Sequence, residues 1–306
     1  MKQEKKTDIS LVKSALADDF SMHVENLTRI DERGDNSEAF SAEYEGKKII
    51  IKIIENDMGF YMLEYKVLEV LRNHGIPVAV PLAYEEKASH LGQSIFVQTA
   101  VPGKQLSRSP LQESPEIYED IGQMLKKIHE IKLPGFGKLE ISDGQLKGQS
   151  VNWRDSLSAY HPNKVSYIDA ADYLQEHGFI NSDEVEKIKK AIASVSEIEL
   201  PQASLLHNDV QPAHIFTDGK KITGLIDMGG VSAGDPRFDI AKTHYYLNKR
   251  FWLAFDKGYG ELTQDSLIDD YLLINSARKL VYRHKNNYTA RIPKAIEMLK
   301  ECLSKS

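Results

Sequence analysis

The sequence predicts an α+β protein with an N-terminal five-stranded antiparallel sheet, one main helix packed with that sheet, and a mostly helical C-terminal lobe. β-prone runs joined by short polar turns follow one another up to residue 54, as in an antiparallel meander. Helical periodicity dominates from Pro115 onward, and Pro102-Gly103 marks the change of pattern. We therefore expect an N-terminal lobe over residues 1–98, a hinge over 99–103 and a C-terminal lobe over 104–306.

The N-terminal lobe has the predicted order β-β-β-α-β-β after a short helix over residues 10–20 with Leu11, Ala15 and Leu16 facing inward. The strands are expected over residues 23–30, 39–44, 48–54, 77–84 and 94–101. The main helix is expected over residues 58–74, with Asn56 or Asp57 as its cap, and Gly75 and Pro77 end it.

The C-terminal lobe begins with a helix that ends near His129. The glycines and proline of residues 134–137 break it, and we expect loop structure from there to Ser150. Further helices are expected over residues 153–160, 168–177, 182–195, 238–247 and 266–288.

Composition limits the classes of function. The 306 residues include 27% charged and 41% hydrophobic residues, which is typical of a soluble protein. A net charge of −6 excludes a broad nucleic-acid surface and is compatible with a cationic small substrate. A single cysteine, Cys302, leaves no internal disulfide, and the apolar runs are too short for a signal peptide or a membrane span. We expect a cytoplasmic monomer or dimer that does not bind membranes.

The strongest chemical signal is His207-Asn208-Asp209, followed by a second acid at Asp227. Asp218-Gly219 lies between two apolar runs and predicts a hairpin, which would bring Asp209 and Asp227 together at one end. Asp209 could cap a helix or accept a proton from a hydroxyl group. Asp227 at the end of a strand could bind a hard cation such as Mg²⁺. We expect Asp235 to start the next helix and Asp239 to give structural support.

Two weaker signals lie in the N-terminal lobe. Lys52 interrupts an apolar strand, where it either guards a sheet edge or solvent face, or faces a site with Glu64 as its partner. The turn Gly34-Asp35-Asn36-Ser37 either surrounds phosphates with backbone N–H groups or is an ordinary hairpin turn.

These motifs together resemble the aminoglycoside phosphotransferase family of kinase-like enzymes. The resemblance rests on the HxD motif at residue 207, IDxGG from residue 226 and GDPxxDIA from residue 234. It extends over residues 25–245 through Leu125-Lys126-Lys127-Ile128-His129, Gly135-Phe136-Gly137, Asn152-Trp153-Arg154, the Lys52 strand, the Glu64 helix and Pro102-Gly103.

The resemblance implies a bilobal protein-kinase-like fold that binds ATP or GTP with Mg²⁺ and phosphorylates a small-molecule hydroxyl. Lys52 would hold the phosphates and pair with Glu64, and Ser37 would belong to the loop that covers them. Residues 98–101, with Gln98, Thr99 and Val101, would face the base, mainly through backbone groups. Asp209 would be the catalytic base and Asp227 the main metal ligand.

One position departs from the commonest family pattern, because His214 stands where most relatives have asparagine. Imidazole is a poorer ligand for Mg²⁺ than an amide oxygen, so His214 as the second metal ligand would favour Mn²⁺ or Zn²⁺. Macrolide kinases and the aminoglycoside kinases that act on a 2″-hydroxyl resemble this sequence in having histidine there.

Two groups of residues in the C-terminal lobe are candidates for binding the acceptor substrate. Acids at Asp265, Asp269 and Asp270 could bind the amines of an aminoglycoside or form a solvated helix face. Aromatic residues could line a pocket for a macrolide or simply pack helices: Tyr245, Tyr246, Phe251 and Trp252. We expect an aminoglycoside kinase; a macrolide kinase, a kinase for a choline-, sugar- or homoserine-like metabolite, and a catalytically inert ligand-binding protein are the alternatives.

Overall fold

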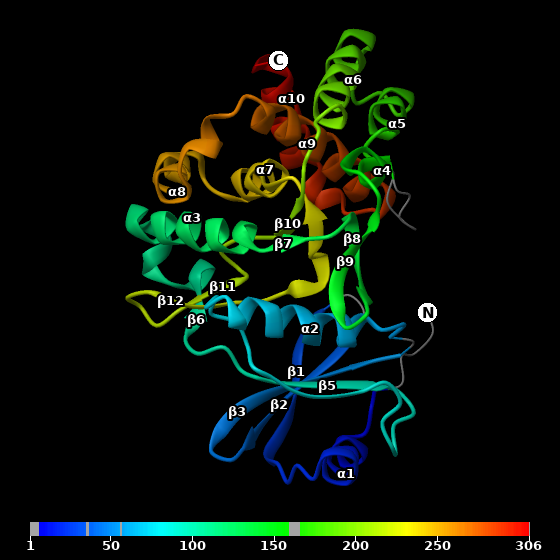
Figure 1. Cartoon of the computed structure of the whole chain (residues 1–306), viewed down its shortest axis with the longest axis vertical. Helices are drawn as coiled ribbons and strands as arrows, with labels where there is room; N and C mark the ends of the chain where they lie inside the picture. The colour runs from blue at the N-terminus through cyan, green and yellow to red at the C-terminus, as the bar shows by residue number, and fades with distance from the viewer. Residues whose placement is uncertain (1–5, 35–36, 56, 159–165, 306) are drawn as a thin grey trace. The chain divides into compact units, whose positions relative to one another are not determined.

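The computed structural model describes residues 6–34, 37–55, 57–158 and 166–305, with the backbone alone for residues 31–34 and 37. It divides into two compact units. The first contains Met1–Gly103 with Thr223–Gly229, and the second contains Lys104–Ile222 with Gly230–Ser306. An antiparallel five-stranded sheet combined with many helices confirms the predicted α+β class (Figure 1).

The first unit is built on an antiparallel sheet of five strands in the order β1-β2-β3-β5-β4. Its strands are β1 (Glu25–Gly34), β2 (Ser37–Tyr44), β3 (Lys47–Ile54), β4 (Pro81–Glu85) and β5 (Ser94–Thr99). The strands β1, β2 and β3 form the predicted meander, and β5 then pairs with β3 with Lys52 opposite Phe96.

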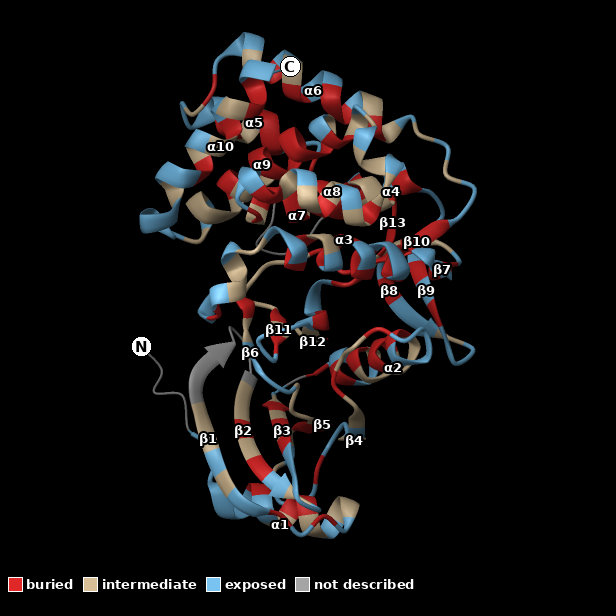
Figure 2. Ribbon diagram, turned by 90° about the vertical axis from the view of Figure 1, so that its left-hand side faces the viewer, coloured by how far each residue is buried: buried red, intermediate tan, exposed pale blue. Residues whose placement is uncertain are grey.

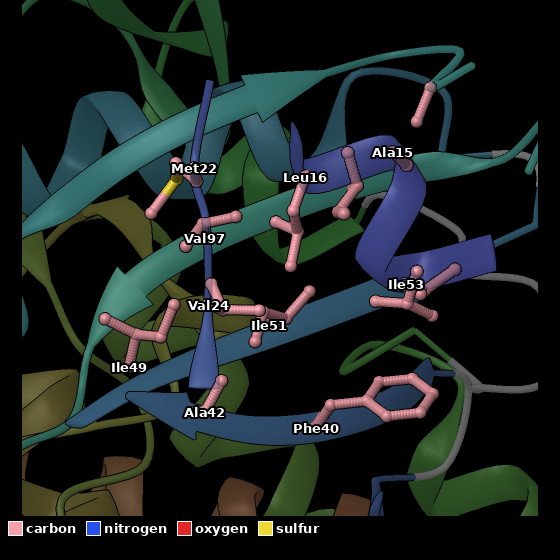
Figure 3. Close-up of a cluster of buried hydrophobic side chains, with 13 residues drawn as sticks. Ala15, Leu16, Met22, Val24, Phe40, Ala42, Ile49, Ile51, Ile53 and Val97 are labelled. Carbon is pink, nitrogen blue, oxygen red and sulfur yellow. The ribbon is translucent and has the colours of Figure 1, made fainter. Parts of the chain in front are cut away.

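One face of this sheet is covered by α1 (Ile9–Phe20). Alternate residues of β3, namely Ile49, Ile51 and Ile53, join Leu16 of α1 in one buried apolar cluster (Figure 3). Leu11 was expected in this core but is exposed, and Val12 is buried instead. Val12, Ala15 and Leu16 lie at i, i+3 and i+4, which places them on one side of a helix.

The opposite face carries α2 (Phe60–Asn73). Its N-cap is Gly59 without a side-chain hydrogen bond, which corrects the prediction of Asp57 as the cap; the buried Asp57 contacts the first turn instead. Asp57 accepts hydrogen bonds from the backbone N–H of Tyr61 at 2.9 Å and from the Tyr84 hydroxyl at 2.9 Å. The other expected cap, Asn56, lies outside the described residues.

The expected strand over residues 77–84 is shorter than predicted, because its first part pairs elsewhere. The carbonyl of Pro77 accepts the N–H of Leu225 at 2.8 Å, and Val78 forms a parallel bridge with Leu225. The hydroxyl of Thr223 also donates to the carbonyl of Pro102 at 2.5 Å. These contacts attach Thr223–Gly229, which includes Asp227, to the first unit.

The second unit is mostly helical, as expected. Its α-helices are α3 (Pro115–Glu130), α4 (Trp153–Ser158), α5 (Ala170–Glu176), α6 (Ser182–Ser196), α7 (Pro236–Tyr246), α8 (Trp252–Tyr259), α9 (Leu267–Lys285) and α10 (Ile292–Lys305). Helix α9 is buried along most of its length (Figure 2), because α5, α6, α7 and α10 all contact it. Short 3₁₀ helices cover Leu106–Arg108, Pro110–Glu113, Met228–Gly230, Lys249–Phe251, Glu261–Gln264 and Thr289–Arg291.

The second unit also contains a sheet in the order β7-β10-β13-β8-β9, and this corrects the prediction of loop structure up to Ser150. Its strands are β7 (Lys132–Leu133), β8 (Phe136–Ser142), β9 (Gln145–Ser150), β10 (Ala203–Leu206) and β13 (Ser232–Gly234). Gly135 and Gly137 have positive φ, so they shape the irregular start of β8. A Cβ at Gly148 would lie 2.3 Å from the backbone nitrogen of Phe136, so glycine also permits β9 to approach closely.

The hairpin predicted at Asp218-Gly219 is present. Strands β11 (Ile215–Thr217) and β12 (Ile222–Leu225) adjoin in a three-stranded sheet with β6 (Lys104–Gln105). Asp218 turns the chain by accepting the N–H groups of Lys220 and Lys221 on its side chain. Within the described ranges, none of the helices has the length and apolar character needed to cross a membrane.

Helices α3 and α8 touch backbone to backbone through two glycines. A Cβ at Gly122 would lie 2.2 Å from the carbonyl oxygen of Phe255, and one at Gly258 would lie 1.9 Å from that of Glu119. We predict that Gly122→Ala forces the helices apart and lowers the free energy of unfolding by about 1–3 kcal/mol in urea denaturation. Gly75→Asn is the control, because its neighbourhood is open and asparagine tolerates positive φ. Equal stability of Gly122→Ala and the wild type would contradict the close packing.

Candidate active site

The His207-Asn208-Asp209 triplet leaves the end of a buried strand in the second unit. Strand β10 pairs with β7 on one side and β13 on the other, and all four of its residues are buried. The segment that follows, residues 207–214, is named the HND loop below. Its first side chain, His207, is only 1% exposed, so the loop begins inside the protein.

Asp239 of α7 holds the start of this loop. Its carboxylate accepts the backbone N–H of His207 at 2.7 Å and that of Asn208 at 2.8 Å. Asp239 is fully buried, and His129 of α3 contacts it through Nε2 at 3.2 Å. The Tyr259 hydroxyl lies 2.7 Å from Nδ1 of the same histidine. The expectation that Asp239 gives structural support is therefore confirmed.

The charge of Asp239 is balanced by its neighbours. Burial raises the pKa of this carboxyl, but the hydrogen bond from His129 and the positive charges of His129, His207 and Lys242 together hold the pKa below its usual value. The carboxylate is therefore the stable form at neutral pH. It serves as a double acceptor for the loop.

Asn208 links the HND loop to β13 and α7. Its φ of 67° lies in the left-handed region, which asparagine tolerates. Its Nδ2 donates to the carbonyl of Gly230 at 2.9 Å and to the Ser232 hydroxyl at 2.7 Å, while Lys242 Nζ donates to its Oδ1 at 3.1 Å. Burial lowers the pKa of Lys242 to about 8.

The carboxylate of Asp209 is 27% exposed and held in place by three side chains. Gln211 Nε2 donates to its Oδ2 at 3.1 Å, and His214 Nδ1 lies 3.2 Å from the same oxygen. The half-buried Tyr246 hydroxyl is hydrogen-bonded to Asp209; desolvation and this acid raise the pKa of that phenol. Lys279 Nζ in turn donates to the Tyr246 hydroxyl at 2.7 Å. Asp209 is thus an oriented, accessible acceptor.

In the first unit, the predicted pair of Lys52 and Glu64 is present. Lys52 Nζ lies 2.5 Å from Glu64 Oε1, and the Glu64 side chain is only 5% exposed. The even-numbered residues of β3 face α2, which is why a lysine in an apolar strand can meet a glutamate of that helix. The edge-guarding alternative is excluded, because β3 is paired on both sides.

The residues predicted to face the base lie at the end of β5. Gln98 is buried, and Thr99 Oγ1 accepts the N–H of Val80 at 2.9 Å. Val101 packs against Gly224, where an added Cβ would lie 2.2 Å from its side chain. Asp35 and Asn36 of the predicted phosphate turn lie outside the described residues, as does the side chain of Ser37.

Asp227 is exposed and belongs to the first unit. Its φ of 68° is positive, and the nearby Gly229 leaves room beside the carboxylate, since a Cβ there would lie 3.4 Å from Asp227 Oδ1 and 3.2 Å from the Phe60 ring. His214 belongs to the second unit, so joint metal binding by these two residues stays a prediction, as does the approach of Asp227 to Asp209.

Of the three acids predicted to bind the substrate, Asp265 already has other partners. Asp265 accepts from Arg237 at 2.8 Å and from the N–H of Leu267 at 2.9 Å, so it starts α9. Asp269 is exposed, and partial burial raises the pKa of Asp270.

The aromatic candidates are also used mainly for packing. Phe251 stacks on Tyr118 and Trp252 stacks on His244, whereas Tyr246 lies beside Asp209.

Sequence reasoning missed several residues that hold the site. Lys242 follows Asp239 by three positions on α7, a spacing that could have suggested a shared face. Tyr259 meets His129 across 130 positions of sequence, and Lys279 meets Tyr246 across 33, so no local pattern indicated them.

Comparisons with known proteins identify a matching family and proteins of similar fold. A family model described as the phosphotransferase enzyme family matches residues 27–272. Hygromycin-B 4-O-kinase of Escherichia coli is 24% identical over 269 residues, covering 82% of this chain and 72% of the relative.

Solved structures with similar folds include two antibiotic kinases. A thermostable mutant of aminoglycoside phosphotransferase APH(4)-Ia, in a ternary complex with AMP-PNP and hygromycin B, has a TM-score of 0.71 at 20% identity, covering 96% of this chain and 97% of that chain. Spectinomycin phosphotransferase APH(9)-Ia, in complex with ADP and spectinomycin, has a TM-score of 0.64 at 15% identity. The match covers 97% of this chain and 95% of that chain. These likenesses show a shared fold.

Asp239→Asn should lower both stability and phosphoryl transfer, because an amide replaces one acceptor oxygen by a donor beside two backbone N–H groups. We expect a loss of about 2–4 kcal/mol in the free energy of unfolding, measured by urea denaturation at pH 7. The native pKa of Asp239 is below the unfolded value, so its ionisation stabilises the protein above pH 3.8, and this contribution is lost as the pH falls below that value.

The stability difference between wild type and Asp239→Asn should therefore narrow below pH 3.8. Asp172→Asn provides the control, since Asp172 forms an exposed ion pair with Lys189 and its loss should change stability by less than about 1 kcal/mol. Similar small effects for both substitutions would contradict the anchoring role of Asp239.

Proposed function

Because this chain belongs to the phosphotransferase enzyme family, we propose that it transfers the γ-phosphate of ATP or GTP to a hydroxyl group of an aminoglycoside. The observation that carries the proposal is the anchored HND loop, which orients the accessible carboxylate of Asp209 within the fold of this family. Antibiotic kinases among the relatives act on hygromycin B or bind spectinomycin, which supports an aminoglycoside acceptor.

In the proposed reaction, Asp209 accepts the proton of the substrate hydroxyl. The hydroxyl oxygen attacks the γ-phosphorus as the bond to the β-phosphate oxygen breaks, and the nucleoside diphosphate leaves. Gln211 and His214 hold Asp209 in orientation through contacts to Oδ2. Most of the catalysis in such reactions comes from positioning and charge neutralisation.

Lys52 is proposed to neutralise the phosphates of the nucleotide. Its ammonium group is fixed by the buried carboxylate of Glu64, and its side chain is 23% exposed, so it can meet a ligand without losing its partner. Solved relatives in complex with AMP-PNP or ADP support a nucleotide as the phosphate donor. Ser37, Thr99 and Val101 complete the proposed nucleotide contacts, with Gln98 beside them.

Asp227 is proposed to bind Mg²⁺. The donor fits the metal, because Mg²⁺ prefers carboxylate oxygens and the Asp227 side chain is exposed. When bound, the ion neutralises charge that develops on the phosphates. His214 is the proposed second ligand; its nitrogen suits Mn²⁺ better than Mg²⁺, so Mn²⁺ should support activity at least as well.

Asp209→Asn is expected to lower kcat by about 10²- to 10⁴-fold while nucleotide affinity changes little, because the amide cannot accept the hydroxyl proton. Phosphate transfer to hygromycin B and spectinomycin would be followed by mass spectrometry. Asp218→Asn is the matched control, since Asp218 lies in the exposed turn of the hairpin and should leave kcat unchanged. Full activity of Asp209→Asn would remove Asp209 from the mechanism.

The same assay includes macrolides, choline, sugar amines and homoserine as acceptors. A phosphorylated macrolide or metabolite would keep the mechanism and change the substrate class. Nucleotide binding without transfer to any acceptor would favour the inert ligand-binding alternative.

Lys52→Met should raise the KM for the nucleotide about tenfold or more, because it removes the positive charge beside the phosphates. It also leaves Glu64 buried without its partner, so the thermal midpoint should fall. The double variant Lys52→Met with Glu64→Gln separates the two effects, because it restores stability without restoring the KM. Lys66→Met, on the side of α2 where Lys66 pairs with Glu69, is the control. An unaltered KM for the nucleotide in Lys52→Met would show that the phosphates do not bind beside Lys52.

A further inference from the structure

Helices α7 and α9 of the second unit pack against each other, and their contacts recur at matching positions. The rings of Phe238 on α7 and Tyr271 on α9 lie 5.6 Å apart. Eight residues further along each helix, Lys279 Nζ of α9 donates to the Tyr246 hydroxyl of α7 at 2.7 Å. Because both helices advance by the same number of residues between the two contacts, they run in the same direction.

Midway between these contacts, Lys242 of α7 lies opposite Asn275 of α9, because residues four apart share one face of a helix. The half-buried Lys242 ammonium has three N–H donors, and one of them goes to Asn208 Oδ1 in the HND loop at 3.1 Å. Burial and the positive charge of Arg278 both disfavour the charged form and lower the pKa of Lys242 to about 8. Two cations of α7 and α9 therefore act on each other beside the HND loop.

Asn275 has a buried N–H donor that meets no acceptor. Its side chain is only 7% exposed, and among the described residues none accepts from its Nδ2. Two neighbours indicate how the amide is turned. Arg278, which can only donate, gives a hydrogen bond to the Tyr167 hydroxyl at 2.9 Å, and this hydroxyl donates its own proton to Asn275 Oδ1 at 3.2 Å. With the amide reversed, the phenol proton would lose this acceptor, so Nδ2 is the atom left without a partner. Buried donors are rarely left in this state in native proteins.

The interface between α7 and α9 thus brings three donor groups together. Lys242 and Arg278 are charged, and Asn275 precedes Arg278 by three residues on the same face of α9. The acids whose charges act on Lys242, namely Asp239 and Asp209, are already engaged. Asp239 accepts two backbone N–H groups, and Asp209 contacts side chains of the HND loop. An oxyanion, whose oxygens accept from several donors at once, would satisfy Nδ2 and balance the two positive charges.

We propose that Lys242, Asn275 and Arg278 form a binding site for an oxyanion, either a phosphate or a carboxylate group, beside the HND loop. Lys242 and Arg278 supply the charge, and Asn275 Nδ2 supplies a directed hydrogen bond. The source of the anion rests on the proposed function: a phosphorylated product gains its phosphate at Asp209, whereas an acidic metabolite acceptor brings a carboxylate. The binding site itself does not depend on that function.

The test is titration of the whole chain with inorganic phosphate at constant ionic strength, without nucleotide or acceptor, followed by the ³¹P NMR shift. Wild type should bind phosphate saturably. Asn275→Asp keeps an acceptor oxygen for Tyr167 and replaces the Nδ2 donor by a second acceptor, so phosphate affinity should fall about tenfold or more. The new carboxylate takes the place of the anion between two cations, so the thermal midpoint without phosphate should rise. A residue that only packs the helices would give a lower midpoint instead.

Lys242→Met is the second variant, because it removes one of the two charges and should weaken phosphate binding about fivefold or more. Lys189→Met is the matched control: it removes the same charge from α6 of the same unit, where Lys189 forms an exposed ion pair with Asp172. It should change phosphate affinity by less than about twofold.

A parallel titration with acetate distinguishes the sources of the anion. Tighter binding of phosphate favours the product as the source, and tighter binding of acetate favours an acidic acceptor. Equal phosphate affinity of Asn275→Asp and wild type would overturn the inference. So would phosphate binding that Lys52→Met abolishes and Asn275→Asp does not. Phosphate binding at this site in a protein that transfers no phosphate would count against the proposed function alone.

Discussion

The HND loop depends on one buried carboxylate, that of Asp239. Where a chain leaves a strand, its N–H groups lose their ladder partners and must find other acceptors. Asp239 supplies an acceptor to two of them at once, and its charge is balanced by His129, His207 and Lys242. Strand β10, helix α7 and the loop thereby become one hydrogen-bonded unit. The orientation of Asp209 follows from this unit and from the contacts of Gln211 and His214.

In the first unit, polar residues are positioned by the alternation of side chains along the strands. Odd-numbered residues of β3 and β5 build the apolar core with α1, and even-numbered residues face α2. The same alternation places Lys52 against Glu64 and brings Gln98 to the same face. The alternation of side chains thus explains the positions of both Lys52 and Gln98. Each of these residues presents a polar atom on the face proposed for the nucleotide.

Helix α9 carries an exposed acid in its first turn and a lysine linked to Asp209 further along. Asp269 is exposed in its first turn, whereas Lys279 reaches Asp209 through Tyr246. These positions are ten residues apart, or about 15 Å along a helix. Lys279 is therefore the residue of this helix that is linked to Asp209.

The pairing of Lys52 with Glu64 was one of two alternatives in the sequence, and the family resemblance favoured it. Periodicity and turn chemistry by themselves determined the succession of strands and helix along the first unit, most helices of the second, and the hairpin at Asp218. Each of these depends on local spacing that the sequence displays directly. The sheet of the second unit was missed, because Gly135 and Gly137 indicated a break and the irregular strand they begin is stabilised only by β9 and β13. The contacts of Tyr259 with His129 and of Tyr246 with Lys279 were likewise decided by tertiary structure. Such contacts join side chains from helices distant along the chain, and their packing geometry leaves no period in the sequence.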